Sequence, residues 1–183
     1  MTTEHAPNIG SFLVAFLIAF LFGCGESETE QNRFLKRLKT IYDHENLADI
    51  NVVESTLGVK FKKSVVTNPE VNAYQLTGQI PSFASEHLSY SVRPDMRASL
   101  QIESIREKFC VDPSDIEAVF GAGKVVSGYP TIALRRQIQI SVGHQKVRNY
   151  QGKGKLYTDF NYTYLQHKCV WSFAISQTLV KEN

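Results

Sequence analysis

The sequence predicts an α+β domain, with short helices toward its N-terminal end and an antiparallel sheet after them. Apolar residues follow a helical period up to about residue 58 and then alternate with polar residues, as they do in half-buried strands. The motif Val-Glu-Ser-Thr-Leu-Gly at 53–58 returns as Ile-Glu-Ala-Val-Phe-Gly at 116–121. The length of 183 residues and the apolar content of 43% suit one packed domain after removal of a targeting segment.

Residues 1–23 are predicted to be a signal peptide and not part of the fold. Residues 12–22 form an unbroken apolar run of eleven residues. That run is well short of the ~20 residues that cross a bilayer as a helix, but it suits the apolar region of a signal peptide. The preceding segment has no Lys or Arg and carries Glu4, which departs from the usual pattern. An uncleaved N-terminal anchor, or a plain signal peptide followed by a coincidental cysteine, is the alternative.

The end of this segment is Leu21-Phe22-Gly23-Cys24, which resembles the lipobox of bacterial lipoproteins. Phe22 is bulkier than the residue usual at its position. The resemblance implies that Cys24 becomes a lipidated N-terminus, whose two or three acyl chains would hold the protein firmly in a membrane. Because Gly25 and not an aspartate follows the cysteine, the resemblance also implies the inner leaflet of the outer membrane in a Gram-negative host, facing the periplasm.

After a short acidic tether at 24–31, residues 32–183 are predicted to form the single α+β domain. Residues 32–42 have apolar residues at helical spacing, and a second helix is expected from about 47 to 57, ended by Gly58. Alternation predicts strands over 74–80, 88–92 and 98–102, with a turn at 93–96. A third helix is expected between Asp112, which can cap it, and Gly121.

The rest of the chain is predicted to be strand, over 132–142, 160–164 and 169–175, with a glycine-rich bend at 149–155. Arg136 has the inward register of the first of these strands. Either the strand bulges there, or the guanidinium is paired. Trp171 and Phe173 are expected to pack in the core.

The repeated motif predicts two tandem helix-then-meander units, at 47–105 and 112–178, packed as one domain. This arrangement resembles the tandem helix-plus-sheet units of β-lactamase inhibitor proteins, and the small SmpA/OmlA outer-membrane lipoproteins that have one such unit. The resemblance implies a non-enzymatic protein that binds a partner or supports envelope assembly.

Three cysteines are present, so lipidation of Cys24 would leave Cys110 and Cys169 as one pair. In an oxidising compartment we expect them to form a disulfide. Two independent buried thiols are the alternative.

The sequence contains no motif for nucleophilic catalysis, nucleotide binding or metal binding, and its five histidines are scattered. We therefore expect a non-enzymatic protein with no metal and no cofactor. An envelope enzyme whose residues converge from distant segments is the alternative.

Charge is divided unevenly along the chain. Residues 24–120 contain 11 basic and 15 acidic residues, a net charge of −4, whereas residues 121–183 contain 9 and 2, a net of +7. This asymmetry favours an acidic protein partner or an anionic envelope component, and an exported protein would not meet nucleic acid. A solvated positive face without a partner is the alternative. Arginine and tyrosine dominate protein–protein contacts, so the predicted partner-binding residues are Arg135, Arg136, Arg148, Tyr150, Tyr157, Tyr162 and Tyr164.

These observations favour a membrane-anchored periplasmic lipoprotein that binds a protein, in the sharper form an inhibitor or immunity protein. A structural accessory lipoprotein of outer-membrane assembly is the alternative.

Overall fold

The structure, a computed structural model, describes residues 28–64, 70–77, 87–95, 97–103, 105, 109–130, 138–165 and 169–181. In these residues it contains three helices and one sheet of eight antiparallel strands, which confirms the α+β class. The helices are α2 (Glu30–Asp43), α3 (Ile50–Leu57) and α4 (Pro113–Phe120). Among the described residues, no helix combines the length and the hydrophobicity needed to cross a membrane.

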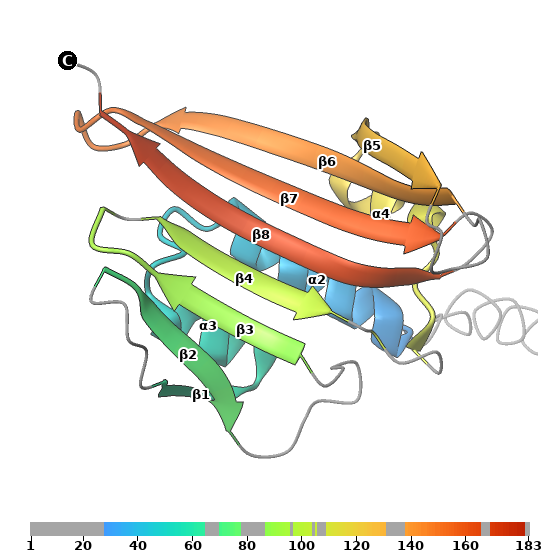
Figure 1. Ribbon diagram of the computed structural model, residues 1–183, viewed down its shortest axis with the longest axis horizontal. Helices are drawn as coiled ribbons and strands as arrows, with labels where there is room; N and C mark the ends of the chain where they lie inside the picture. Colours follow the sequence, from blue (N-terminus) through green and yellow to red (C-terminus); the bar gives the residue numbers. More distant parts are fainter. Residues whose placement is uncertain are drawn as a thin grey trace, which may run out of the picture.

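The sheet has the order β1-β2-β3-β4-β8-β7-β6-β5, so two four-stranded meanders meet at its centre (Figure 1). Their last strands, β4 and β8, are the ones that pair. The strands are β1 (Lys60–Lys63), β2 (Asn72–Thr77), β3 (His87–Val92), β4 (Ala98–Glu103), β5 (Lys124–Pro130), β6 (Ile138–Asn149), β7 (Lys155–Leu165) and β8 (Val170–Val180).

A short helix precedes each meander, α3 before β1–β4 and α4 before β5–β8, in the helix-then-meander order that the repeated motif predicts. We call residues 28–103 the first unit and residues 109–181 the second unit. The long helix α2 belongs to the first unit and lies behind the central strands β4 and β8 (Figure 1).

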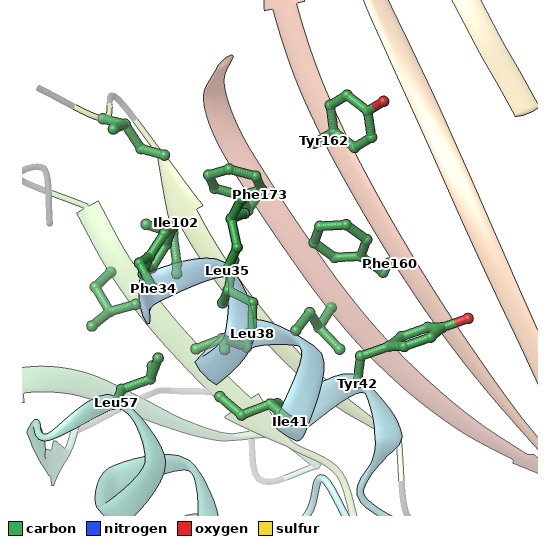
Figure 2. Packing of buried hydrophobic residues seen from close by; sticks show 14 of the residues in the cluster. Phe34, Leu35, Leu38, Ile41, Tyr42, Leu57, Ile102, Phe160, Tyr162 and Phe173 are labelled. Carbon is green, nitrogen blue, oxygen red and sulfur yellow. The ribbon is translucent and has the colours of Figure 1, made fainter. Parts of the chain in front are cut away.

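Helix α2 supplies a large part of the core. It begins two residues before the expected start because the Thr29 side chain accepts a hydrogen bond from the Asn32 backbone N–H. Its apolar side chains Phe34, Leu35, Leu38 and Ile41 are at most 2% exposed. Figure 2 shows them directed toward the strands that carry Ile102, Phe160 and Phe173.

The other two helices begin where an aspartate caps them. Asp49 caps α3, which therefore starts at Ile50 and not near Leu47. Leu47 lies in the α2–α3 connector, where its N–H donates to Gln177 Oε1 (2.7 Å) and its carbonyl accepts from the Tyr90 hydroxyl (2.6 Å). Asp112 caps α4 in a capping box with Pro113 at the first turn, as predicted.

Two of the three cysteines form the expected pair. Cys110 and Cys169 are joined by a disulfide, with their Cα atoms 5.1 Å apart. Next to it the Val170 N–H donates to the Val111 carbonyl at 2.9 Å. The disulfide therefore attaches the segment before α4 to the start of β8.

The edge strands β1 and β5 were not predicted as separate strands. Residues 60–63 have the sequence KFKK, with one apolar residue, and β5 contains a register shift between Val125 and Ser127. Neither segment therefore shows a regular alternation. Strand β6 continues to Asn149, past the expected end at 142. The beginning of that expected strand, 132–137, lies outside the described residues.

The expected bend at 149–155 is the turn between β6 and β7. Trp171 and Phe173 of β8 were both expected in the core. Phe173 is there, with 2% of its surface exposed. A register shift opposite Tyr164 changes the pattern at the start of the strand. Val170 is consequently buried there, and Trp171 is half-buried.

Candidate functional site

The two faces of the sheet have different surroundings. The buried side chains of all three helices pack on one face, and the helices lie behind the sheet in the view of Figure 1. Among the described residues, no helix or strand lies over the opposite face. We call that opposite face, which carries Gln101, Ala174 and Asn161, the uncovered face.

Cross-strand register identifies which side chains share the uncovered face, because direct partners point to the same side. One row of partners crosses all eight strands, and the rows beside it cross the middle of the sheet. The first row consists of Lys62, Gln75, Ser89, Gln101, Ala174, Asn161, Gly143 and Lys124. The neighbouring rows are Ser91, Ser99, Ser176, Asp159 and Gln145, and His87, Glu103, Ser172, Thr163 and Ser141.

Most of these side chains are small or uncharged, and several hydrogen-bond across strands. Gln145 Nε2 donates to Asp159 Oδ1 at 2.8 Å, and the Ser141 and Thr163 hydroxyls are 3.1 Å apart. The uncovered face therefore presents hydroxyl and amide groups and only isolated charges.

A cavity of about 560 Å³ opens where β5 ends its pairing with β6. Strand β5 pairs with β6 as far as Lys124 and Gly143, whereas β6 continues to Asn149. From His144 onward β6 has no strand partner on that side among the described residues. Side chains from both faces of the sheet consequently line one cavity at the sheet edge.

The apolar wall of the cavity consists of Tyr42, Phe120, Ala122 and Val126. The ring of Phe120 stacks on that of Phe160 with centroids 4.0 Å apart, and Tyr42 contacts Phe120 edge-to-face at 5.7 Å. Burial, together with nearby Asp43 and Asp159, raises the pKa of Tyr42. Its hydroxyl therefore stays protonated at neutral pH and can donate a hydrogen bond.

The polar wall consists of Lys124, His144, Gln145, Asp159 and Asn161. Burial lowers the pKa of His144, although the carboxylate of Glu117 partly opposes the shift. In the part of the chain that the structure describes, the buried His144 Nε2 has no hydrogen-bond partner.

Two glycines shape the cavity by allowing close approach. A Cβ on Gly123 would lie 2.7 Å from His144 Nε2, and one on Gly143 would lie 2.7 Å from Asn161 Oδ1. Both distances are too short for van der Waals contact. A larger residue would displace Val142 and His144 at the first position, and Asn161 and Val126 at the second.

Tyr162 carries a second unpartnered polar atom near this region. Its hydroxyl is buried, and no described residue forms a hydrogen bond with it. Burial, with smaller effects from Glu117 and Tyr164, raises the pKa of Tyr162 to about 12. Within the described residues, no group of three His, Cys, Asp or Glu side chains could hold a metal ion.

Arg148, predicted to contact a partner, instead holds the end of α2. Its Nη2 donates to the Asp43 carbonyl at 2.8 Å, its Nη1 is 3.8 Å from Glu45 Oε1, and its side chain is only 19% exposed. Lys146 Nζ binds Asp43 Oδ1 at 2.7 Å. Burial alone would raise the pKa of Asp43, but hydrogen bonds from Lys146 and Lys39 lower it. Part of the charge asymmetry along the sequence is therefore satisfied between the two units.

The four predicted tyrosines do not form one surface. Tyr162 is 1% exposed and belongs to the core, since its register with Val142 and Phe173 places it on the helix side (Figure 2). Tyr164 packs partly against that core, and Tyr150 is half-buried after β6. Tyr157 alternates with the inward residues of β7 and lies on the uncovered face.

Arg135, Arg136 and Cys24 lie outside the described residues. Neither the uncovered face nor the cavity is among the sites predicted from the sequence. The available signal was the small, polar half of each alternating strand.

The chemistry that these residues support is binding, through hydroxyl and amide groups on a broad face and through an aromatic wall in the adjoining cavity. Compared with models of protein families, with curated proteins and with solved structures, the chain matches none.

Proposed function

We propose that this chain is a non-enzymatic lipoprotein, anchored through Cys24 and facing the periplasm from the outer membrane, that binds a protein partner as an inhibitor or immunity protein. The observation that carries the proposal is the uncovered face, which spans eight strands. At about 4.8 Å per strand it is about 34 Å wide, which matches the size of a protein contact.

The composition of the uncovered face also supports a protein partner. Ser, Asn and Gln side chains hydrogen-bond adaptably, and burying them costs less than burying charges. Ala174 lies in the middle of its row, between Gln101 and Asn161, so a partner's backbone could approach the sheet closely there.

Lysines at both ends of the longest row favour an acidic partner. Lys62 lies on β1 and Lys124 on β5, at the two edges of the sheet. A partner that covers the row would bring acidic residues over these edges, and such pairs increase association rates more than affinity.

Two features support the anchored, exported address. The lipobox at 21–24 precedes a polar tether of suitable length, and the Cys110–Cys169 disulfide is typical of an oxidising compartment. The mass of the chain extracted from host membranes tests this part. We expect a chain that starts at Cys24 and carries a diacylglyceryl and an acyl group, and a chain that starts at Met1 without lipid would contradict it.

Site-directed photo-crosslinking in the host envelope tests the binding face. A photoreactive phenylalanine analogue at Ala174 should give a discrete protein adduct, because that position is central on the uncovered face. The same analogue at Ser55, which is exposed on α3, should give none.

A substitution that should block binding is Ala174→Arg, which places a bulky cation in the centre of the uncovered face. With the analogue moved to Ser176 in the adjacent row, this variant should lose the adduct, while Ser55→Arg should retain it. Equal amounts of adduct from the analogue at Ala174 and at Ser55 would contradict the proposal. So would an adduct that Ala174→Arg does not reduce.

A further inference from the structure

We propose that the cavity beside Gly143 receives an amphipathic aromatic side chain of the partner, a tyrosine or tryptophan, with a neighbouring carboxylate bound by Lys124. The inference rests on the proposed function and names the chemistry of its anchor residue. Buried aromatic anchors in pockets supply much of the energy of protein interfaces.

The cavity and the uncovered face form one continuous surface. Asn161 and Gly143 line the cavity and also belong to the row that crosses the sheet through Ala174. A partner seated on the uncovered face would therefore have the cavity at the edge of its footprint.

The volume and apolar wall of the cavity suit an aromatic ring. A volume of about 560 Å³ lies within the range of small-molecule sites and exceeds what a single small aliphatic group needs. Phe120 and Tyr42 present aromatic surface, and rings attract one another in stacked or edge-to-face geometry.

The polar wall suits a ring that ends in a hydroxyl or an N–H. Gln145 uses its amide N–H to bind Asp159, which leaves its carbonyl oxygen as an acceptor. Asn161 offers both an acceptor and donors. An aliphatic side chain would leave these groups without partners, at a cost.

Lys124 supplies the charge preference. It is exposed, and no salt bridge to it occurs among the described residues, whereas Asp159 already accepts a hydrogen bond from Gln145. The cation is therefore available for a carboxylate next to the ring.

An exposed valine at the cavity favours a protein over a free small molecule. Val126, which lines the cavity, is 66% exposed. A ligand confined to the cavity would leave part of Val126 in water, whereas a protein whose side chain enters the cavity could cover it.

The test uses N-acetyl-tryptophan as a probe, titrated into the lipidated full chain in nanodiscs and followed by backbone amide NMR. We expect shifts at Ala122 and Gly143 and a dissociation constant of about 1 mM or tighter. Ala122→Trp, which fills the cavity from an exposed position, should weaken binding at least about tenfold. Ala118→Trp, the same enlargement at an exposed position of α4 that does not line the cavity, is the matched control and should leave binding unchanged.

The charge preference has its own comparison. Lys124→Glu should weaken the binding of N-acetyl-tryptophan by about tenfold. It should leave the binding of the uncharged N-acetyl-tryptophanamide unchanged. Lys153→Glu, an equal charge change on the β6–β7 turn, should affect neither probe. Shifts spread over the surface, or binding insensitive to Ala122→Trp, would overturn the inference.

The crosslinking assay separates this inference from the proposed function. If the Ala174 adduct forms and Ala122→Trp leaves it intact, the inference fails and the proposed function stands. If no adduct forms but the probe binds in the cavity and is lost in Ala122→Trp, the proposed function fails and the cavity retains its preference for aromatic groups. Loss of both the adduct and probe binding in Ala122→Trp supports the two together.

Discussion

The two units share an order of elements, but the short helix of each is attached to its sheet in a different way. In the first unit, Glu54 of α3 is 9% exposed. Its carboxylate accepts from the Phe61 N–H at 2.8 Å and from Lys60 Nζ at 2.7 Å, so the helix is fastened to β1. The hydrogen bond from Lys60 and then that from Phe61 lower the pKa of Glu54.

In the second unit the same position of the repeated motif is Glu117 of α4, and it is exposed. Where Phe61 follows Glu54 by seven positions, Lys124 follows Glu117. The side chain of Lys124 lines the cavity, whereas Phe61 packs against the core. Helix α3 buries Val53 and Leu57, while α4 fully buries only Ile116.

This difference shows how two similar units can divide their tasks. The first unit uses its glutamate and its aromatic residue for stability. In the second unit Glu117 is exposed and Lys124 lines a cavity, and a disulfide joins the segment before α4 to the start of β8.

The largest expected effect is that of removing the disulfide, the covalent link of the second unit. Cys110→Ala with Cys169→Ala should lower the free energy of unfolding by about 4 kcal/mol, because the bridge closes a loop of 59 residues. Urea unfolding measures the loss. Hydrogen exchange should show that the backbone amides of α4 lose more protection than those of α3. Equal loss of protection in the two helices would contradict the proposed division between the units.

A matched pair of substitutions tests the glutamates directly. Glu54→Gln should lower the free energy of unfolding by about 2 kcal/mol, since it weakens charge-assisted hydrogen bonds at a buried position. Glu117→Gln should change it by less than about 0.5 kcal/mol, as expected for an exposed side chain. Thermal or urea unfolding of both variants checks this. Similar losses would mean that the second helix is fastened as firmly as the first.

The pH dependence of stability should also differ between the Glu54 and Glu117 variants. The pKa of Glu54 is lower in the folded than in the unfolded protein. Its contribution is therefore complete above the unfolded pKa and is lost as the pH falls through the folded pKa. Glu54→Gln should flatten the fall of stability in this acidic window, whereas Glu117→Gln should leave it unchanged.

The smallest effect is expected at His144 in the second unit. Because burial lowers its pKa, the unfolded chain takes up the proton first as the pH falls below about 6.5. Stability should therefore be complete above that pH and decline between it and the folded pKa. His144→Phe should abolish this shallow decline in urea-unfolding measurements from pH 7 to 5. An unchanged slope would show that His144 does not titrate differently on folding.

Local signals explain which parts could be predicted from sequence. The α4 cap at Asp112 could be predicted because it depends on a few neighbouring residues. The pairing of Cys110 with Cys169 could be predicted from the number of cysteines. The fold class follows from periodicity. Strand β5 could not be predicted, because a register shift interrupts its alternation.

The candidate site depends on contacts between distant residues, which no local pattern encodes. Arg148 was assigned to a partner, but it binds the end of α2, 105 positions earlier in the chain. The cavity exists because β5 is shorter than β6, a property of pairing and not of either strand's composition.

The position of β8 has a consequence for how the chain completes its fold. The last strand in sequence, Val170–Val180, lies between β4 and β7 in the middle of the sheet. Until these eleven residues are in place, β4 and β7 each keep an open backbone edge that can pair with other chains. Loss of the final segment would therefore split the sheet and not merely shorten it. The two meanders can therefore pair with each other only through the residues up to Val180.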